Sequence, residues 1–416
     1  MKDSLRTERQ NVSSKKQPLA LLVVILASLT AFAPLSIDMY LPSFPQIAAD
    51  FGVTVARVEM SLATFFIGLS FGQLLYGTVT DRFGRKRPLY VGLTIYCAAS
   101  LLCAVAPNVE ALIILRLFQA LGACGGIVIA RATVRDLFDH SESARVFSLL
   151  MLVMGVAPIL APLLGGYVAL YFGWHAIFTV VSVFSAIILA AVYRFLPETR
   201  EPNPDIKLTQ TFGTYFNILK DRNFLAFTLG GGLAQAGMFA YITGSPFVFI
   251  ELFGVPAEYF GWIFGSNALG MIALSQINAR VVRNVDPTRL LRVSLSVTAV
   301  FSLVLIFAGI FNLGFWGTAI PIFLYVASLG MILPNATAGA LSEQSANAGA
   351  ASALIGSLQY GLAAIASSLV SYFNNGTSFA MTAIIGTCGI AAFLALNLLL
   401  GAKREFAVAE EHTTFG

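Results

Sequence analysis

Charged side chains are scarce in this sequence. Asp, Glu, Lys and Arg make up 11% of the 416 residues, whereas 57% are hydrophobic and the mean hydropathy is +0.80. A water-soluble chain of this length could not cover so much apolar surface with polar groups. Lipid as the solvent removes this difficulty, and a spanning helix needs about 20 apolar residues. The composition therefore predicts an integral membrane protein with room for roughly a dozen spanning helices.

Residues that build catalytic or metal sites are equally few. The three histidines, His140, His175 and His412, fall in loops or in the C-terminal tail without a ligand-spaced partner. The four cysteines lie inside apolar runs, which is typical of small buried hydrophobic residues and not of a disulfide framework. The chain has no Gly-Lys dipeptide and hence no Walker A motif of an ATP-driven pump. We therefore expect no enzyme activity, no metal and no cofactor.

Apolar runs of spanning length recur twelve times, in two groups of six. They lie at about 19–41, 55–78, 88–106, 108–131, 144–170, 174–196, 224–252, 258–280, 289–310, 314–338, 349–373 and 378–401. The pattern predicts an all-α integral membrane protein with 12 transmembrane helices in two pseudo-symmetric six-helix bundles, a layout typical of transporters. The predicted parts are a tail (1–18), a first bundle (19–196), a central loop (197–223), a second bundle (224–401) and a second tail (402–416).

Basic residues are placed on one side of the predicted membrane. All but two of the 25 Lys and Arg residues fall on the same side of the twelve spans, and the exceptions are Arg57 and Arg116. By the positive-inside rule, both termini are cytoplasmic. The net charge of +4 belongs to these short loops, so it does not indicate a nucleic-acid partner. We expect a monomer in the inner (cytoplasmic) membrane, with the lipid bilayer and a small-molecule substrate as its partners.

Two opposite charges stand out within the apolar runs of the first half. Asp38, in "APLSIDMYLPSFP", comes near the end of the first run, and Arg116 lies eight residues into the fourth. A charge in hydrocarbon costs roughly 2.5–3.5 kcal/mol by insertion scales. The two side chains fall at comparable depth, so we predict that they face one cavity and compensate each other. The alternatives are that Asp38 caps a helix end at the interface and that Arg116 only snorkels to the surface.

Polar side chains within the spans are candidates for contact with a substrate. Besides Asp38, these candidates are Tyr40, Gln119, Tyr241, Asn267, Asn335 and Gln359. A ligand cavity is mostly apolar with a few polar groups that orient the ligand. The alternative for each residue is a helix–helix hydrogen bond, which is worth under about 1 kcal/mol on average in lipid.

The loop after the second run carries a specific motif. "GTVTDRFGRKRP" matches G-x-x-x-D-R-x-G-R-K, with Gly77, Asp81, Arg82, Gly84 and Arg85 in place. The glycines permit close approach and a tight turn, and a carboxylate can complement the N-terminus of a helix. This loop resembles the signature of the major facilitator superfamily, and the resemblance implies a conformational gating role for these residues.

Two further stretches support this resemblance. "RLFQALGACGG" is similar to the fourth-helix motif of the superfamily, on Arg116 and Gln119. "GVAPILAPLLGGY" is similar to the fifth-helix antiporter motif, on Pro162, Gly165 and Gly166, with Pro158 one turn earlier. Prolines and glycines let a spanning helix bend and pack closely, which alternating access requires.

"SIDMYLPSFP", "LPET" after run six and "GSPFVFIE" in run seven together resemble the Bcr/CflA family of bicyclomycin- and chloramphenicol-resistance proteins. The resemblance implies proton-coupled export of small, mostly apolar drugs by alternating access. Protons are then the coupling ion, carried by Asp38 with Arg116 as its partner. Asp81 would latch the inner side against a second-half helix that begins near Ser345. The alternatives are an importer or exporter of a small metabolite with the same fold and, less compatible with these motifs, a channel.

Overall fold

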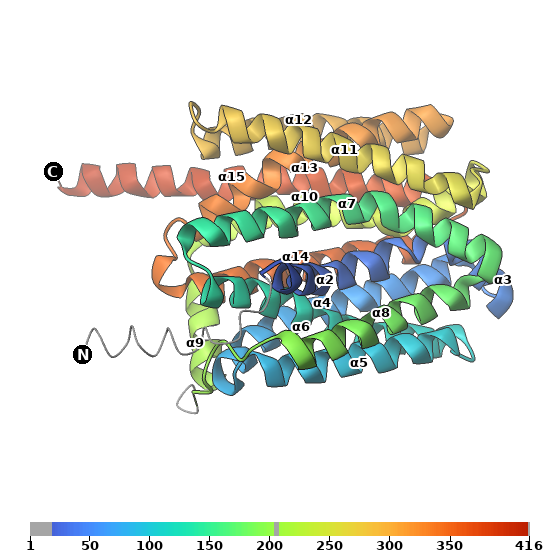
Figure 1. The fold of residues 1–416 in the computed structure, drawn as a ribbon. Helices are drawn as coiled ribbons and strands as arrows, with labels where there is room; N and C mark the ends of the chain where they lie inside the picture. Colours follow the sequence, from blue (N-terminus) through green and yellow to red (C-terminus); the bar gives the residue numbers. More distant parts are fainter. Residues whose placement is uncertain (1–18, 204–207, 415–416) are drawn as a thin grey trace.

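The computed structural model describes residues 19–203 and 208–414, and every regular element in this part is a helix. The first half contains α2 (Leu19–Asp38), η2 (Leu41–Ser43), α3 (Phe44–Phe51), α4 (Val55–Phe83), α5 (Lys86–Ala104), α6 (Val109–Leu137), α7 (His140–Phe172) and α8 (Trp174–Phe195). The rest contains α9 (Leu208–Leu219), α10 (Arg222–Ser245), η3 (Pro246–Leu252), α11 (Ala257–Val281), α12 (Pro287–Ile310), α13 (Gly314–Leu341), η4 (Ser345–Asn347), α14 (Ala348–Tyr372) and α15 (Phe379–Thr414). The long helices run side by side in one bundle (Figure 1).

Eleven helices of the described chain are long and apolar enough to cross a membrane. The remaining predicted span is α11, which has 25 residues but carries many small and polar ones. It packs between α7 and α13, so neighbouring helices shield its polar face. Gly261 faces Leu163 of α7, and Gly270 faces Phe323 of α13, with no room for a side chain at either glycine. Close packing of small residues thus holds α11 in the bundle.

Two spans are broken at the same end of the bundle. The first was predicted to end near residue 41, but the chain continues through η2 and α3 to Phe51. The helix α2 itself ends at Asp38, three residues before the predicted end, and Pro42 and Pro45 occupy the first turns of the short helices that follow, where a missing N–H is tolerated. In the second half, α10 passes at Pro246 into η3, a π-helical segment. The breaks lie near each other, since α3 and η2 both contact η3.

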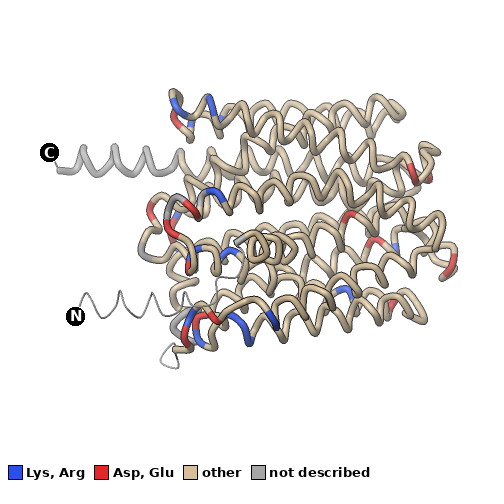
Figure 2. The backbone as a smooth tube through the Cα atoms, in the orientation of Figure 1, with Lys and Arg blue, Asp and Glu red and all other residues tan. Residues whose placement is uncertain are grey.

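Lysine and arginine gather at one end of the bundle, which we call the basic end (Figure 2). The central stretch, predicted as a loop, contains α9, which lies across this end (Figure 1). Tyr215 and Ile218, three residues apart on α9, are buried against the bundle, whereas Phe212 and Phe216 are exposed. Apolar residues at helical spacing therefore allow this segment to pack as a helix, although its composition is polar overall.

The two halves of the sequence meet along two seams. One joins α4 to α14, and the other joins α7 to α11. In the first seam, Ser70 donates a hydrogen bond of 2.8 Å to the carbonyl oxygen of Ser357. Beside it, Phe66 contacts the rings of Phe239 and Tyr360 at centroid distances of 4.5 and 6.5 Å.

Candidate functional site

Asp38 is the last residue of α2 and lies where the first span breaks. Its side chain is 4% exposed, and it forms no hydrogen bond or ion pair within the described residues. A carboxylate at a helix C-terminus also faces the negative end of the helix dipole. Asp38 is therefore a buried acid that its own helix destabilises when it is charged.

Arg116 is fully buried in α6 and is surrounded by aromatic rings. Its Cζ lies 4.2 Å from the ring centroid of Phe65 and 4.7 Å from that of Tyr40. The guanidinium donates to the Gln119 side chain at 2.5 Å and to the carbonyl oxygen of Ser36 at 2.9 Å. Ser36 is in the last turn of α2, so Arg116 complements the exposed carbonyls of a helix end.

The predicted pairing of Asp38 with Arg116 is wrong, because no ion pair joins them in the described structure. Arg116 instead belongs to a polar network inside the first half. Gln119 donates to the hydroxyl of Ser100 at 2.8 Å, and the hydroxyls of Tyr96 and Ser36 are 2.6 Å apart. The Nε of Arg116 has no hydrogen-bond partner in the described residues, so this buried network is only partly satisfied.

The predicted substrate contacts fall into separate groups. Tyr241 of α10 and Asn267 of α11 are joined by a hydrogen bond of 2.9 Å, and the charge of Asp38 acts on Tyr241. Tyr40 and Gln119 are fully buried in the first half, with Tyr40 bonded to Ser61 at 3.0 Å. The structure therefore joins Tyr241 and Asn267 directly, whereas Asp38 acts on Tyr241 only through its charge.

Two more candidates lie elsewhere in the second half. Asn335 of α13 donates to Asn278 of α11 at 2.7 Å, so its amide serves helix packing, which was the alternative reading. Gln359 of α14 is partly buried and packs against Gly232 of α10. Neither residue contacts Asp38 in the described part of the chain.

The predicted antiporter stretch of α7 touches both halves at the broken end. Pro158 and Pro162 lie inside the continuous helix. A Cβ at Gly165 would overlap the carbonyl oxygen of Met39, directly after Asp38. A Cβ at Gly166 would lie 3.0 Å from the carbonyl oxygen of Ala257, where α11 begins. Adjacent glycines thus let α7 contact the break of α2 on one side and the second half on the other.

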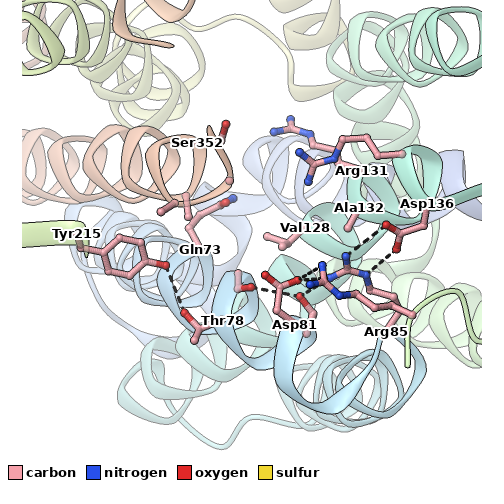
Figure 3. Close-up of a pocket in the computed structure, with 17 residues that line it drawn as sticks. Gln73, Thr78, Asp81, Arg85, Val128, Arg131, Ala132, Asp136, Tyr215 and Ser352 are labelled. Atoms are coloured by element: carbon pink, nitrogen blue, oxygen red, sulfur yellow. Dashed lines mark hydrogen bonds and ion pairs between the residues drawn. The ribbon is translucent and has the colours of Figure 1, made fainter. Parts of the chain in front are cut away.

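A cavity of about 370 Å³ opens at the basic end between the first half and α14 (Figure 3). Its walls come from α4, α6, α9 and the first turns of α14. Arg131 and Arg135 of α6 line it and form no ion pair within the described residues. Tyr215 of α9 contributes its hydroxyl, 3.4 Å from that of Thr78. Burial raises the pKa of Tyr215, so this hydroxyl remains protonated.

The motif loop forms one wall of this cavity. Arg85 is 4% exposed and reaches Asp81 at 2.9 Å and Asp136 at 2.8 Å (Figure 3). Burial acts to lower the pKa of Arg85, but its hydrogen bonds and the charges of Asp136 and Asp81 outweigh burial and raise it. Gly84 has φ +81°, which only glycine adopts readily. Arg82 lies over the ring of Phe83. A Cβ at Gly77 would lie 3.5 Å from Ala353 of α14, so Gly77 faces the second half.

Asp81 was predicted to bind the start of a second-half helix, and in this structure it does not. It pairs with Arg200 at 2.9 Å as well as with Arg85. Gly349 and Ala350, in the first turn of α14, line the same cavity. The helix start therefore faces Asp81 across the cavity, and Arg200 is the partner that sequence reasoning missed.

Glu198 was also missed. Its carboxylate accepts the backbone N–H of Arg85 at 2.7 Å and that of Lys86 at 3.1 Å, which caps the start of α5. "LPET" had been noted only as part of a family resemblance. The signal that it contains is a glutamate in a short segment beside a helix that begins without its own capping side chain.

Glu59 was missed as well, although it stands five residues into α4. Its side chain is 0% exposed, and neither carboxylate oxygen has a hydrogen-bond partner. The sequence signal was a glutamate in a predicted span. It stands near the start of that span, where charged residues are usually exposed.

Comparison with known proteins agrees with this fold. The sequence profile of the Major Facilitator Superfamily matches residues 26–368. An uncharacterized MFS-type transporter, YdgK, of Bacillus subtilis is 36% identical over 91% of this chain and 95% of its own. A bicyclomycin resistance protein homolog of Haemophilus influenzae is 33% identical over 91% of this chain and 95% of its own. The nucleoside transporter NupG has a similar structure, with a TM-score of 0.70, 13% identity and coverage of 91% of this chain and 99% of its own.

These matches define the class of protein as a multi-pass membrane transporter. The chain belongs to the Major Facilitator Superfamily and, within it, to the Bcr/CflA-like family.

Proposed function

We propose that this protein exports small, mostly apolar drugs in exchange for protons. The observation that carries the proposal is Asp38, a buried acid at the break of α2 without a partner in the described residues, whose charge acts on Tyr241 of the second half. The printed name of the Haemophilus influenzae relative, a bicyclomycin resistance protein homolog, supports a drug as the substrate. Intramembrane carboxylates without a permanent counter-ion are typical of proton relays.

The proposed orientation follows the distribution of charge. The basic end faces the cytoplasm of a bacterial inner membrane, and both termini lie on that side. We call the opposite end the outer end. The basic-end cavity then opens to the cytoplasm, and a drug enters through it. The protein acts as a monomer and needs no cofactor apart from protons.

The proposed cycle uses Asp38 as a site that a proton and a drug affect in opposite ways. When the basic end is open, Asp38 releases its proton to the cytoplasm and a drug binds between the halves. When the outer end opens, a proton neutralises Asp38 and weakens binding, so the drug leaves. The membrane potential adds about 2.3 kcal/mol per charge per 100 mV to this exchange.

A second candidate function is transport of a small metabolite by the same fold. Arg131 and Arg135, which have no acidic partner in the described residues, make the basic-end cavity attractive to an anion. Fold alone does not decide substrate or direction.

Inside-out vesicles that contain the purified protein would test the proposal. After an acid-inside gradient is formed, addition of chloramphenicol or bicyclomycin should make the lumen more alkaline, because each drug molecule that enters displaces a proton. Empty vesicles and vesicles with Asp38→Asn are the controls. Drug uptake without alkalinisation would contradict proton exchange, and alkalinisation by an anionic metabolite but by neither drug would favour the second candidate.

A further inference from the structure

Glu59 lies close to the surface of the outer end and is nevertheless sealed from it. Arg57, two residues earlier in α4, is half exposed and pairs with Glu110 at 3.2 Å. Glu59 is 0% exposed, and both of its oxygens lack a partner. A buried carboxylate without donors is costly to keep charged, whereas the neutral acid is much less so.

The second half forms the cover over Glu59. Ser371 lies beside it, in the last turn of α14, but the Ser371 hydroxyl donates to the carbonyl oxygen of Ser367 at 3.1 Å. Glu251 of η3 also acts on Glu59 through its like charge. Since α14 packs along α4, separation of these two helices would expose Glu59 to water.

Three other charged groups near this end, Asp50, Arg57 and Glu110, have their own partners. Asp50 of α3 accepts a hydrogen bond of 2.6 Å from the indole of Trp174 of α8. Arg57 of α4 and Glu110 of α6 pair with each other. No basic side chain of the described residues pairs with Glu59, so only a proton can neutralise it without a change in the packing.

We propose that Glu59 is a second protonation site, which takes up one proton from the external solution when the outer end closes. The proposal rests on the alternating-access function proposed above. The closed outer end encloses the neutral acid, and the open outer end exposes a carboxylate to water. The proton returns to the external solution when this end reopens, so Glu59 adds nothing to the number of protons transported. It makes closure of the outer end depend on external pH.

Spin labels on the full-length protein in lipid nanodiscs would test this dependence. Val105→Cys at the end of α5 and Trp316→Cys at the start of α13 are exposed sites of the two halves at the outer end. The background has the four native cysteines replaced by alanine and is first shown to transport. It then also carries Asp38→Asn, so that the titration of Asp38 does not contribute to the pH dependence. Double electron–electron resonance then gives the ratio of closed to open outer ends from about pH 5 to about pH 8, without any drug.

Since the closed state holds the extra proton, a rise in pH should favour the open state. The closed-to-open ratio of the parent protein should fall by about tenfold per pH unit over the range in which Glu59 titrates. Glu59→Gln, a neutral side chain of the same shape, should remain closed and change less than about twofold over the whole range. Glu110→Gln, an exposed acid of the same end, should behave like the parent. A Glu59→Gln variant that opens with pH as the parent does would overturn the proposal.

Infrared spectroscopy covers the case in which Glu59→Gln does not fold. In an Asp38→Asn background, Glu59 is the buried unpaired acid of the described spans. The carbonyl band of a protonated carboxylic acid should be present at neutral pH, and its absence would overturn the proposal. The distance measurement uses no drug and no gradient, so its outcome is separate from that of the vesicle assay for drug–proton exchange.

Discussion

Arg116 is held by Gln119, one turn further along α6, with 2.5 Å between Nη1 and Oε1. The same guanidinium donates to the carbonyl oxygen of Ser36, so a single side chain ties α6 to the last turn of α2. This arrangement places the positive charge in the framework of the first half and leaves Asp38 without a basic partner in the described residues.

Arg116→Ala should therefore destabilise the fold. A hydrogen bond to a charged group is worth about 1.5–3 kcal/mol, so loss of two should cost roughly 3 kcal/mol or more. Arg116→Lys keeps the charge but not the planar guanidinium that reaches both partners. Its stability should therefore lie between that of the parent and that of Arg116→Ala. Thermal unfolding in detergent measures the loss. Arg57→Ala, which removes an exposed pair, is the control and should cost about 0–1 kcal/mol. Unchanged stability of Arg116→Ala would mean that the network is dispensable.

Asp38→Asn should fold and insert normally but lose coupled export. The amide resembles the protonated acid in shape and charge, so the variant should not exchange a proton. Accumulation driven by one charge, about 2.3 kcal/mol or roughly fiftyfold at 100 mV, should disappear. Drug flux and lumenal pH in vesicles measure it, with Glu110→Gln as an active control. Gradient-driven drug accumulation by the Asn variant at the parent level would contradict the coupling role.

Substitutions at Gly165 and Gly166 of α7 should have different effects, one on stability and the other on the conformational equilibrium. Gly165→Ala drives a methyl group into the Met39 carbonyl within the first half, so it should lower stability. Gly166→Ala meets the Ala257 carbonyl of the other half at 3.0 Å, so it should disfavour the state with the outer end closed. Thermal unfolding and the spin-label distance between Val105→Cys and Trp316→Cys separate the two effects. Gly213→Ala on α9, where a Cβ meets nothing, is the control. Identical behaviour of the two variants would contradict their assignment to different contacts.

Asp81 and Arg200 should act in opposite directions on the basic-end cavity. Arg200→Ala removes one of the two basic partners of Asp81 and leaves Arg85, so Asp81 can meet the start of α14 more readily, which favours the closed cavity. Asp81→Ala removes the carboxylate and favours the open cavity. A carboxylate at a helix N-terminus is worth about 0.3–2 kcal/mol, or a shift of about two- to thirtyfold. The reactivity of Ser352→Cys, which lines the cavity, towards an impermeant thiol reagent reports the state. Ser342→Cys, exposed at the same end outside this cavity, is the control. Equal reactivity of Ser352→Cys in both variants would rule out the latch.

The class of this protein was accessible from its sequence. Spanning helices can be recognised in the sequence because a helix that crosses lipid needs a continuous apolar run. The distribution of Lys and Arg on one side of these runs can also be recognised in the sequence. The loop from Gly77 to Pro88 and the glycine pair of α7 were recognised because their backbone requirements depend on local residue types. α11 and α9 were less accessible, since neighbouring helices shield the polar face of α11 and the bundle buries one side of α9.

Tertiary structure alone decided which charges meet. Position along a helix predicts depth, at about 1.5 Å per residue, but not the neighbour that the side chain faces. Asp38 and Arg116 were matched in depth, yet Arg116 bonds to Ser36 and Gln119, and Asp38 acts on Tyr241 of the other half. Glu59 is fully buried in α4, which packs against α14, and Ser371 of α14 comes some three hundred residues later in the chain. Its environment follows from how the two halves pack, because burial of a charge is a property of the surface that covers it.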